Sequence, residues 1–262
     1  MASSFPKLSL TGRVAVVTGS SRGIGRAIAV HLHSLGARVV VNYVSNSGEA
    51  DGLIAELNIA ANSPLPTAIA VRANIADPDQ VKHLFDRAEK EFGSRVHIVV
   101  NNAGVMIRNY PTVAGTTVEE FDYTFNINAK GTFLCSREAA NRLAHGGGGR
   151  IINITTSATG DLLPGYAAYA SSKAAVETMT KILAKELKGT KITANCVAPG
   201  PVHTDLFSTE KSEETVRKIA EACPLGRIGE TVDISQFVGF LASDAGEWIN
   251  GQAIKVNGGF II

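Results

Sequence analysis

A tyrosine and a lysine four positions apart are the residues of this sequence whose chemistry is easiest to interpret. Tyr169 and Lys173 begin and end the run Tyr-Ala-Ser-Ser-Lys, in a segment at 167–187 whose pattern predicts a helix. Residues at i and i+4 share one helical face, so the lysine ammonium is expected beside the phenol. A neighbouring positive charge lowers the pKa of a phenol from its ordinary value of about 10. The pair therefore predicts a proton donor tuned toward neutral pH.

Five other short motifs accompany this pair. In their order and separations they resemble the short-chain dehydrogenase/reductase family, in its single-domain form, and the resemblance runs from about Leu10 to the C-terminus. It implies a dinucleotide-dependent oxidoreductase. The motifs are Thr-Gly-Ser-Ser-Arg-Gly-Ile-Gly at 18–25, Asn-Asn-Ala-Gly at 101–104, Asn128 within Asn-Ile-Asn-Ala-Lys-Gly, Thr-Thr-Ser at 155–157, and Pro199 followed by Gly200.

Short apolar runs alternate with helical patterns along the chain. This alternation predicts an α/β fold with a doubly wound parallel sheet flanked by helices, a Rossmann fold, and the family resemblance completes the sheet at seven strands. The predicted strands lie at 13–17, 37–41, 68–71, 97–100, 150–154, 192–197 and 253–256. The predicted helices lie near 23–35, 48–60, 77–91, 117–144, 167–187 and 231–242.

One region interrupts this rhythm. No linker or change of composition divides the 262 residues, so we expect a single domain over 1–262. The segment 199–224 is a long insertion with a short helical patch around 213–221. Because long loops in compact domains often close over ligands, we assign this segment to substrate closure.

Composition narrows the partners and the location. A net charge of +1, with no stripe of basic residues, argues against nucleic acid. The apolar runs are far shorter than the roughly 20 residues of a membrane span. Cys135, Cys196 and Cys223 are too few and too scattered for a disulfide framework or a metal cluster, so no metal and a reducing compartment are expected. The first ten residues lack an apolar signal core and arginine, which predicts a cytosolic protein.

A glycine-rich turn supplies the predicted dinucleotide site. Gly19, Gly23 and Gly25 follow the first strand and open a helix, where absent side chains let the backbone approach a pyrophosphate. Their G-x-x-x-G-x-G spacing is that of the short-chain family. Ser21, Arg22 and Ile24 complete the turn and are candidate contacts.

The charge near the second strand predicts NADPH rather than NADH. An NAD-specific site usually places a carboxylate about 20 residues beyond the glycines, and here that place holds Asn42 and Tyr43. Without a carboxylate, nothing repels a 2′-phosphate. Arg22, Ser45 and Asn46 are candidate partners for its oxygens.

The family resemblance assigns further contacts with the dinucleotide. Asn74 and Ile75 match positions beside the adenine, and 102–104 match the loop that passes the adenine ribose. The segment after the sixth strand matches the part that holds the nicotinamide. The corresponding residues are Asn102, Ala103 and Gly104 in the ribose loop, and Pro199, Gly200, Val202 and Thr204 near the nicotinamide.

Reduction of a carbonyl needs a hydride at carbon, a proton at oxygen and donors that hold the developing oxyanion. Tyr169 is the candidate acid. The resemblance implies that Lys173 also binds the nicotinamide ribose and that Asn128 anchors a water linking the lysine to solvent. A fourth group polarises the carbonyl. Counting back thirteen residues from the tyrosine gives Thr156, whereas the family usually has a serine, and we place Ser157 slightly ahead of it.

These residues predict an NADPH-dependent reductase of a small, largely apolar ketone or aldehyde. Two alternatives stay open. One is a 3-oxoacyl carrier-protein reductase, which requires a basic surface to dock its carrier. The other is a catalytically silent dinucleotide-binding scaffold or redox sensor. The C-terminal stretch, 248–262, is apolar at its end, and because family members bury it between subunits we expect a homotetramer or homodimer. The basic candidates for docking a carrier are Arg142, His145, Lys188 and Lys191.

Overall fold

The computed structural model describes residues 8–208 and 212–262. Predictions that depend on 1–7, or on 209–211 within the 199–224 segment, lie outside these ranges. Seven strands form one sheet in the order β3-β2-β1-β4-β5-β6-β7, and every neighbouring pair is parallel, which confirms the predicted fold. The strands are β1 Val14–Val17, β2 Arg38–Tyr43, β3 Ala68–Arg72, β4 Ile98–Asn101, β5 Arg150–Ile154, β6 Thr193–Pro199 and β7 Ala253–Val256.

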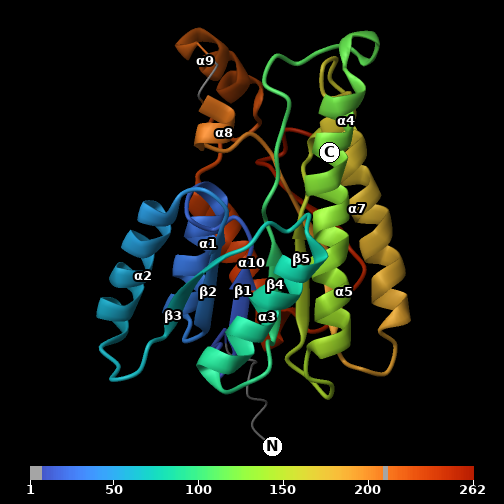
Figure 1. Ribbon diagram of the computed structural model, residues 1–262. Helices are drawn as coiled ribbons and strands as arrows, with labels where there is room; N and C mark the ends of the chain where they lie inside the picture. Colours follow the sequence, from blue (N-terminus) through green and yellow to red (C-terminus); the bar gives the residue numbers. More distant parts are fainter. Residues whose placement is uncertain (1–7, 209–211) are drawn as a thin grey trace, which may run out of the picture.

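Helices cover both faces of the sheet (Figure 1). Alternate residues of β1 point to opposite faces, so Ala15 and Val17 join one hydrophobic cluster while Val14 and Val16 join the other. The first cluster receives α1 Gly23–Ser34, α2 Ser47–Ala61 and α10 Thr231–Ala242. The second receives α3 Pro78–Phe92, α5 Thr132–Arg142 and α7 Ala167–Glu186.

The single helix expected at 117–144 is divided into three parts. α4 Val118–Phe125 starts with a capping box, in which the Thr117 and Glu120 side chains each bond the other residue's backbone N–H. A π-helical turn, η2 Asn126–Gly131, then joins it to α5. Such turns widen a helix locally and are frequent at functional sites. Sequence periodicity did not reveal this one.

The segment 199–224 contains α8 Asp205–Ser208 and α9 Glu213–Ala222, and the second of these confirms the predicted helical patch. Figure 1 shows α8 and α9 on one side of the carboxyl ends of the strands and α4 on the other. The remaining short elements are η1 Val113–Gly115, α6 Ala158–Asp161 and η3 Asp244–Gly246.

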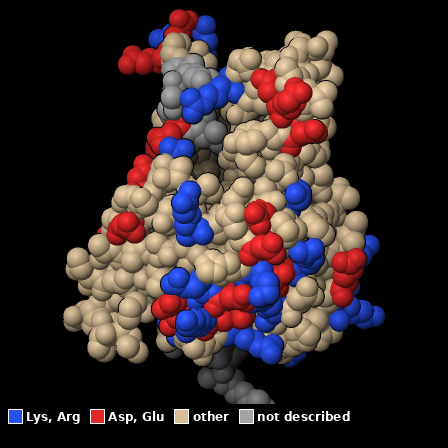
Figure 2. All heavy atoms as spheres, in the orientation of Figure 1, with Lys and Arg blue, Asp and Glu red and all other residues tan. Residues whose placement is uncertain are grey.

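Charged side chains of both signs are interleaved on the face drawn in Figure 2. The cysteines Cys135, Cys196 and Cys223 are all buried and free. In residues 8–208 and 212–262, no helix has both the length and the apolar character needed to cross a membrane.

Candidate active site

Tyr169 and Thr156 meet at the carboxyl edge of the sheet. Tyr169 lies in the first turn of α7 and is partly buried, and Thr156 comes two residues after β5 ends. A side-chain hydrogen bond joins the two hydroxyls. The structure thus places a phenol and a second hydroxyl where one carbonyl oxygen can reach both.

The pKa of Tyr169 differs from the sequence-based expectation. Burial raises it above the ordinary value of 10, and the hydrogen bond with Thr156 offsets this only in part. Lys173 is not among the groups that lower this pKa, contrary to the expectation from the sequence. A raised pKa keeps the phenol protonated at neutral pH, which is the state that a proton donor needs.

Lys173 is buried on the same helix, with only 3% of its surface exposed. Its Nζ donates to the carbonyl oxygen of Ile154, at the end of β5, at 2.8 Å. This bond directs the ammonium toward the backbone, so it does not offset the burial of the phenol. Burial also lowers the pKa of Lys173 to about 8, although the neighbouring Cys196 acts in the opposite direction.

Asn128 joins the π-helical turn to the loop that follows β4. It is fully buried, its Oδ1 accepts from the Val105 N–H at 2.8 Å, and its Nδ2 donates to the Val105 carbonyl at 2.9 Å and to Ser172 Oγ at 3.0 Å. A Cβ on Gly104 would lie 3.2 Å from Lys173 Nζ and 3.3 Å from Asn128 Oδ1. These contacts bring Gly104, Asn128 and Lys173 together, with the Asn128 amide engaged by the protein itself.

Ser157 has a different position from Thr156. It is 3% exposed and precedes α6, and its N–H donates to the Pro199 carbonyl at 2.8 Å. The partner that the structure gives Tyr169 is Thr156. The geometry thus favours the residue found by the ungapped count over the serine that we had placed first.

The glycine turn fits a pyrophosphate. A Cβ on Gly19 would lie 2.9 Å from Ala103 Cα, and one on Gly25 would lie 2.5 Å from the Gly19 carbonyl oxygen. No side chain caps α1 at Arg22, and the first turn holds no acidic residue, so the positive helix end is open to an anion. The Thr18 hydroxyl accepts from the N–H groups of Asn102 at 3.0 Å and of Ala103 at 3.1 Å, which fixes the turn against the loop after β4.

Asn42 turns inward rather than toward the place of a ribose. It is 1% exposed, its Oδ1 accepts from the Gly19 N–H at 3.1 Å, and its Nδ2 donates to the carbonyls of Val71 at 3.2 Å and Ala73 at 2.9 Å. Both the oxygen and the nitrogen of the side-chain amide are therefore hydrogen-bonded to backbone groups. Asn42 thus supports the glycine turn from within the protein.

The residues just beyond β2 lie nearer the surface. Ser45 Oγ donates to Asn46 Oδ1 at 3.2 Å, and Asn46 Nδ2 donates to Glu49 Oε2 at 3.0 Å, while Tyr43 is partly buried. Arg72, at the end of β3, donates to the Val44 carbonyl at 2.9 Å. Glu49 and Arg72 belong to no sequence motif, so the sequence alone did not place them beside the residues that follow β2.

Arg22 reaches across to the segment after β6. Its guanidinium lies 3.7 Å from Asp205 Oδ2, in an exposed ion pair. A Cβ on Gly23 would lie 3.6 Å from Thr204 Cγ2, so this segment packs on the glycine turn. The partly buried Ser21 and Ile24 belong to the same turn.

The other predicted contacts divide into buried and exposed groups. Ile75 is 3% exposed and packs in the core, where a Cβ on Gly131 would lie 2.7 Å from Ile75 Cδ1. Asn74 is exposed and accepts from the Ala76 N–H at 3.0 Å. Val202 is buried and pairs with Gly229, and a Cβ on Gly200 would lie 2.7 Å from Asn257 Cβ. Pro199 ends β6 and is buried.

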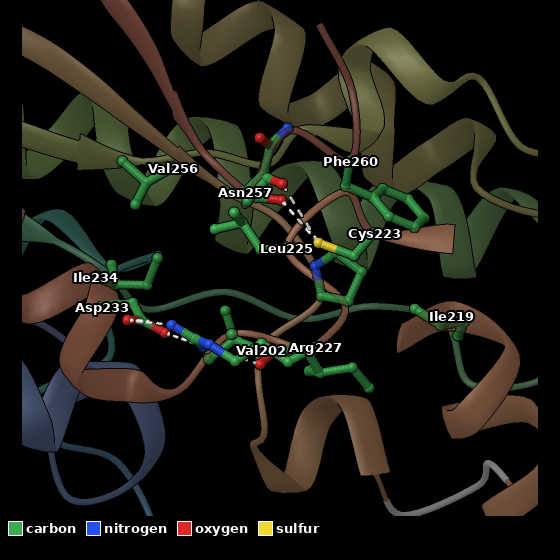
Figure 3. A pocket seen from close by; sticks show the side chains of 14 residues that line it. Val202, Ile219, Cys223, Leu225, Arg227, Asp233, Ile234, Val256, Asn257 and Phe260 are labelled. Carbon is green, nitrogen blue, oxygen red and sulfur yellow. Dashed lines mark hydrogen bonds and ion pairs between the residues drawn. The ribbon is translucent and has the colours of Figure 1, made fainter. Parts of the chain in front are cut away.

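A cavity of about 230 Å³ lies elsewhere, and Val202 is one of the side chains that line it (Figure 3). Cys223, Asn257 and Phe260 line it, and Arg227 and Asp233 close one side through a paired ion contact at 2.7 and 2.9 Å. None of the hydroxyls at the end of β5 contributes to its lining. We therefore place the chemistry at Tyr169 and Thr156, where the reactive groups meet, and not in this cavity.

Together, the fold and this group of residues define a Rossmann-type oxidoreductase. Residues 19–261 match the profile described as enoyl-(acyl carrier protein) reductase. Two curated relatives from Arabidopsis thaliana are similar over nearly the whole chain. One, named "NADPH-dependent aldehyde reductase-like protein, chloroplastic", is 59% identical over 98% of this chain and 97% of its own length. The other, "NADPH-dependent aldehyde reductase 2, chloroplastic", is 55% identical over 99% of this chain and 97% of its own length.

A solved structure is also similar. The short chain dehydrogenase from Burkholderia cenocepacia, in complex with NADP, is 32% identical with a TM-score of 0.87, covering 96% of this chain and 98% of that one. The chain belongs to the short-chain dehydrogenase/reductase family. These findings confirm the predicted family and agree with the predicted reductase activity and use of NADPH.

The predicted cytosolic location is wrong by the same comparison, because both Arabidopsis relatives are named chloroplastic. The prediction relied on signals that the first ten residues lack. A missing signal is not an observation of where a protein resides, and residues 1–7 lie outside the described ranges.

Proposed function

We propose that the protein reduces the carbonyl of a small, largely apolar aldehyde or ketone with NADPH, and that Tyr169 donates the proton. The observation that carries this proposal is the meeting of Tyr169, Lys173 and Thr156 at the end of β5. Lys173 Nζ bonds the Ile154 carbonyl there at 2.8 Å, and Thr156 is the side-chain partner of the Tyr169 phenol. The names of the two Arabidopsis relatives support aldehydes as substrates and NADPH as coenzyme.

Each residue of the group has a distinct task. NADPH, when bound, supplies the hydride. The Thr156 hydroxyl donates to the carbonyl oxygen and stabilises the negative charge that develops there. Tyr169 then protonates this oxygen, which its raised pKa permits because the phenol still carries its proton at neutral pH. Lys173, with a pKa near 8, can gain and release a proton close to neutral pH beside the phenol.

The coenzyme would be held by groups from several loops. The glycine turn and the N–H groups at the start of α1 take the pyrophosphate. Arg22 and Ser45 take the 2′-phosphate, and the loop at 102–104 takes the adenine ribose. The chain forms one domain, in which 199–224 is the substrate loop.

Loss of NADPH absorbance tests the reaction directly. The substrates are a panel of aldehydes, ketones, cyclic imines and short keto-thioesters, each measured with NADPH and with NADH. We expect turnover of free aldehydes or ketones and a preference for NADPH. Turnover confined to thioesters would replace this proposal by the carrier-protein reductase, and absence of any turnover with intact coenzyme binding would favour the silent scaffold.

Replacing Arg22 by alanine is expected to raise the dissociation constant of NADPH about tenfold or more while that of NADH changes little, because only NADPH has the phosphate that this guanidinium would contact. Fluorescence titration of both coenzymes measures the effect. Arg26→Ala is the matched control, since Arg26 lies one turn further along α1 and pairs with Glu56. If the affinities for NADPH and NADH fall equally, Arg22 does not contact the 2′-phosphate.

The structure does not favour the carrier-protein alternative. Arg142 contacts Asp86 at 2.7 Å, Glu138 at 2.8 Å and Glu89 at 3.3 Å, so its charge is neutralised within the protein. Lys188 and Lys191 follow the C-terminal end of α7, and His145 follows α5, whereas Tyr169 lies in the first turn of α7. A carrier docked on these residues would be separated from Tyr169 by the length of a 20-residue helix, about 30 Å.

We also infer a homodimer or homotetramer. Trp248 is 98% exposed and Ile262 is fully exposed, and large apolar side chains in water favour association. Light scattering is expected to give a multiple of 27.5 kDa, and Trp248→Glu is expected to shift the mass toward 27.5 kDa. A wild-type protein that scatters as a monomer would contradict this assembly.

A further inference from the structure

Three phenol rings lie in a row beside the proposed site. Tyr110, in the loop after β4, stacks on Tyr166 with ring centroids 5.3 Å apart and planes at 28°. Tyr166, the residue before α7, meets Tyr169 edge-on at 6.4 Å and 71°. The first two rings form an aromatic pair whose neighbour is the candidate acid.

The backbone holds Tyr110 in an uncommon conformation. Its φ is +48°, in the left-handed region that residues with a side chain rarely adopt. Gly165 lies against it with φ +86°, and a Cβ there would be 2.6 Å from the Tyr110 carbonyl oxygen. Residues held in sparsely populated conformations cluster at binding and catalytic sites. The crossing at Gly165 fixes the Tyr110 ring over Tyr166.

The Tyr166 hydroxyl is hydrogen-bonded to the Tyr110 side chain. Burial raises the pKa of Tyr166, and the neighbouring Tyr110, Tyr169 and Asp161 raise it further. The ring therefore stays neutral throughout the working pH range. It presents an apolar π-surface with no charge.

We propose that Tyr110 and Tyr166 form an aromatic wall that selects carbonyl compounds conjugated with a flat ring over saturated ones of equal size; this inference rests on the proposed function. A substrate whose oxygen is held by Tyr169 and Thr156 has Tyr166, the residue just before α7, as the neighbouring ring. Aromatic surfaces prefer each other in offset or edge-to-face geometry, beyond the gain from burying apolar area. A flat ring can adopt such a geometry against this pair, and a puckered ring cannot.

Benzaldehyde and cyclohexanecarbaldehyde test the wall, because they share the same heavy-atom count and differ in flatness. The quantity measured is the ratio of their kcat/KM values, compared between variants so that intrinsic reactivity cancels. In Tyr166→Leu the ratio is expected to fall about two- to tenfold, mainly through the KM of benzaldehyde. Tyr166→Phe retains the ring and should retain the ratio.

Tyr123→Leu is the matched control, because Tyr123 lies on α4 and is 58% exposed; its ratio should equal that of the wild type. If Tyr166→Leu fails to melt cooperatively, Tyr110→Leu replaces it and the same fall is expected. An unchanged ratio in a folded leucine variant would overturn the wall while leaving the reductase in place. Failure of the wild-type protein to reduce any carbonyl would instead overturn the proposed function.

Discussion

Replacing Tyr169 by phenylalanine is expected to lower kcat/KM for any carbonyl substrate about 10²- to 10⁴-fold, the usual contribution of a positioned proton donor. The phenyl ring keeps the packing and the contact with Tyr166 but has no proton to give. NADPH binding should persist, because the glycine turn and α1 are untouched. Steady-state assays that follow the loss of NADPH absorbance give the rate, and fluorescence titration gives the affinity for NADPH.

Tyr123→Phe is the control for the loss of one hydroxyl from an exposed tyrosine, and its rate should match the wild type. A Tyr169→Phe enzyme that turns over at the wild-type rate would end the assignment of Tyr169 as the acid. If NADPH affinity is lost together with the rate, Tyr169 acts in coenzyme binding and the donor has to be sought elsewhere.

Thr156→Val is expected to lower kcat about 10²- to 10³-fold. This is the usual effect of removing one preorganised donor to a developing oxyanion. Valine keeps the branched shape but removes the hydroxyl that bonds Tyr169. Ser157→Ala should have a far smaller effect, since the structure anchors Ser157 through its backbone N–H on Pro199. Steady-state kinetics of the two variants on one substrate compares them directly.

The reverse order of effects would restore Ser157 as the polarising group. Thr156→Ser provides a further check, because serine keeps a hydroxyl at the same position and should recover most of the rate that valine loses. Recovery would show that the hydroxyl, and not the methyl group, matters at this position.

The fold and the centre of the site could be predicted because each rests on local patterns. Buried parallel strands appear as apolar runs, and Gly19, Gly23 and Gly25 mark the turn after the first of them. The Tyr169 and Lys173 pair follows from helical spacing. What spacing does not give is the direction of a buried ammonium. The bond from Lys173 to the Ile154 carbonyl, together with the burial of the phenol, reverses the expected shift in pKa.

Other features depend on contacts between distant segments. Arg142 was a docking candidate from its charge alone, but three carboxylates from α3 and α5 neutralise it. Tyr110 belongs to no motif, and its place depends on the backbone crossing at Gly165. The π-helical turn around Asn128 was hidden in a continuous helical pattern. These outcomes follow from tertiary packing, which one sequence does not display.

The inward orientation of Asn42 sets a limit on redesigning the enzyme toward the unphosphorylated coenzyme. A carboxylate at this position would face the carbonyl oxygens of Val71 and Ala73, which would lose their donor in a buried place. Because Asn42 also holds the Gly19 N–H, the substitution would disturb the glycine turn without placing the carboxylate at the ribose. An acidic side chain is better introduced at Val44, which follows β2 directly and is 51% exposed.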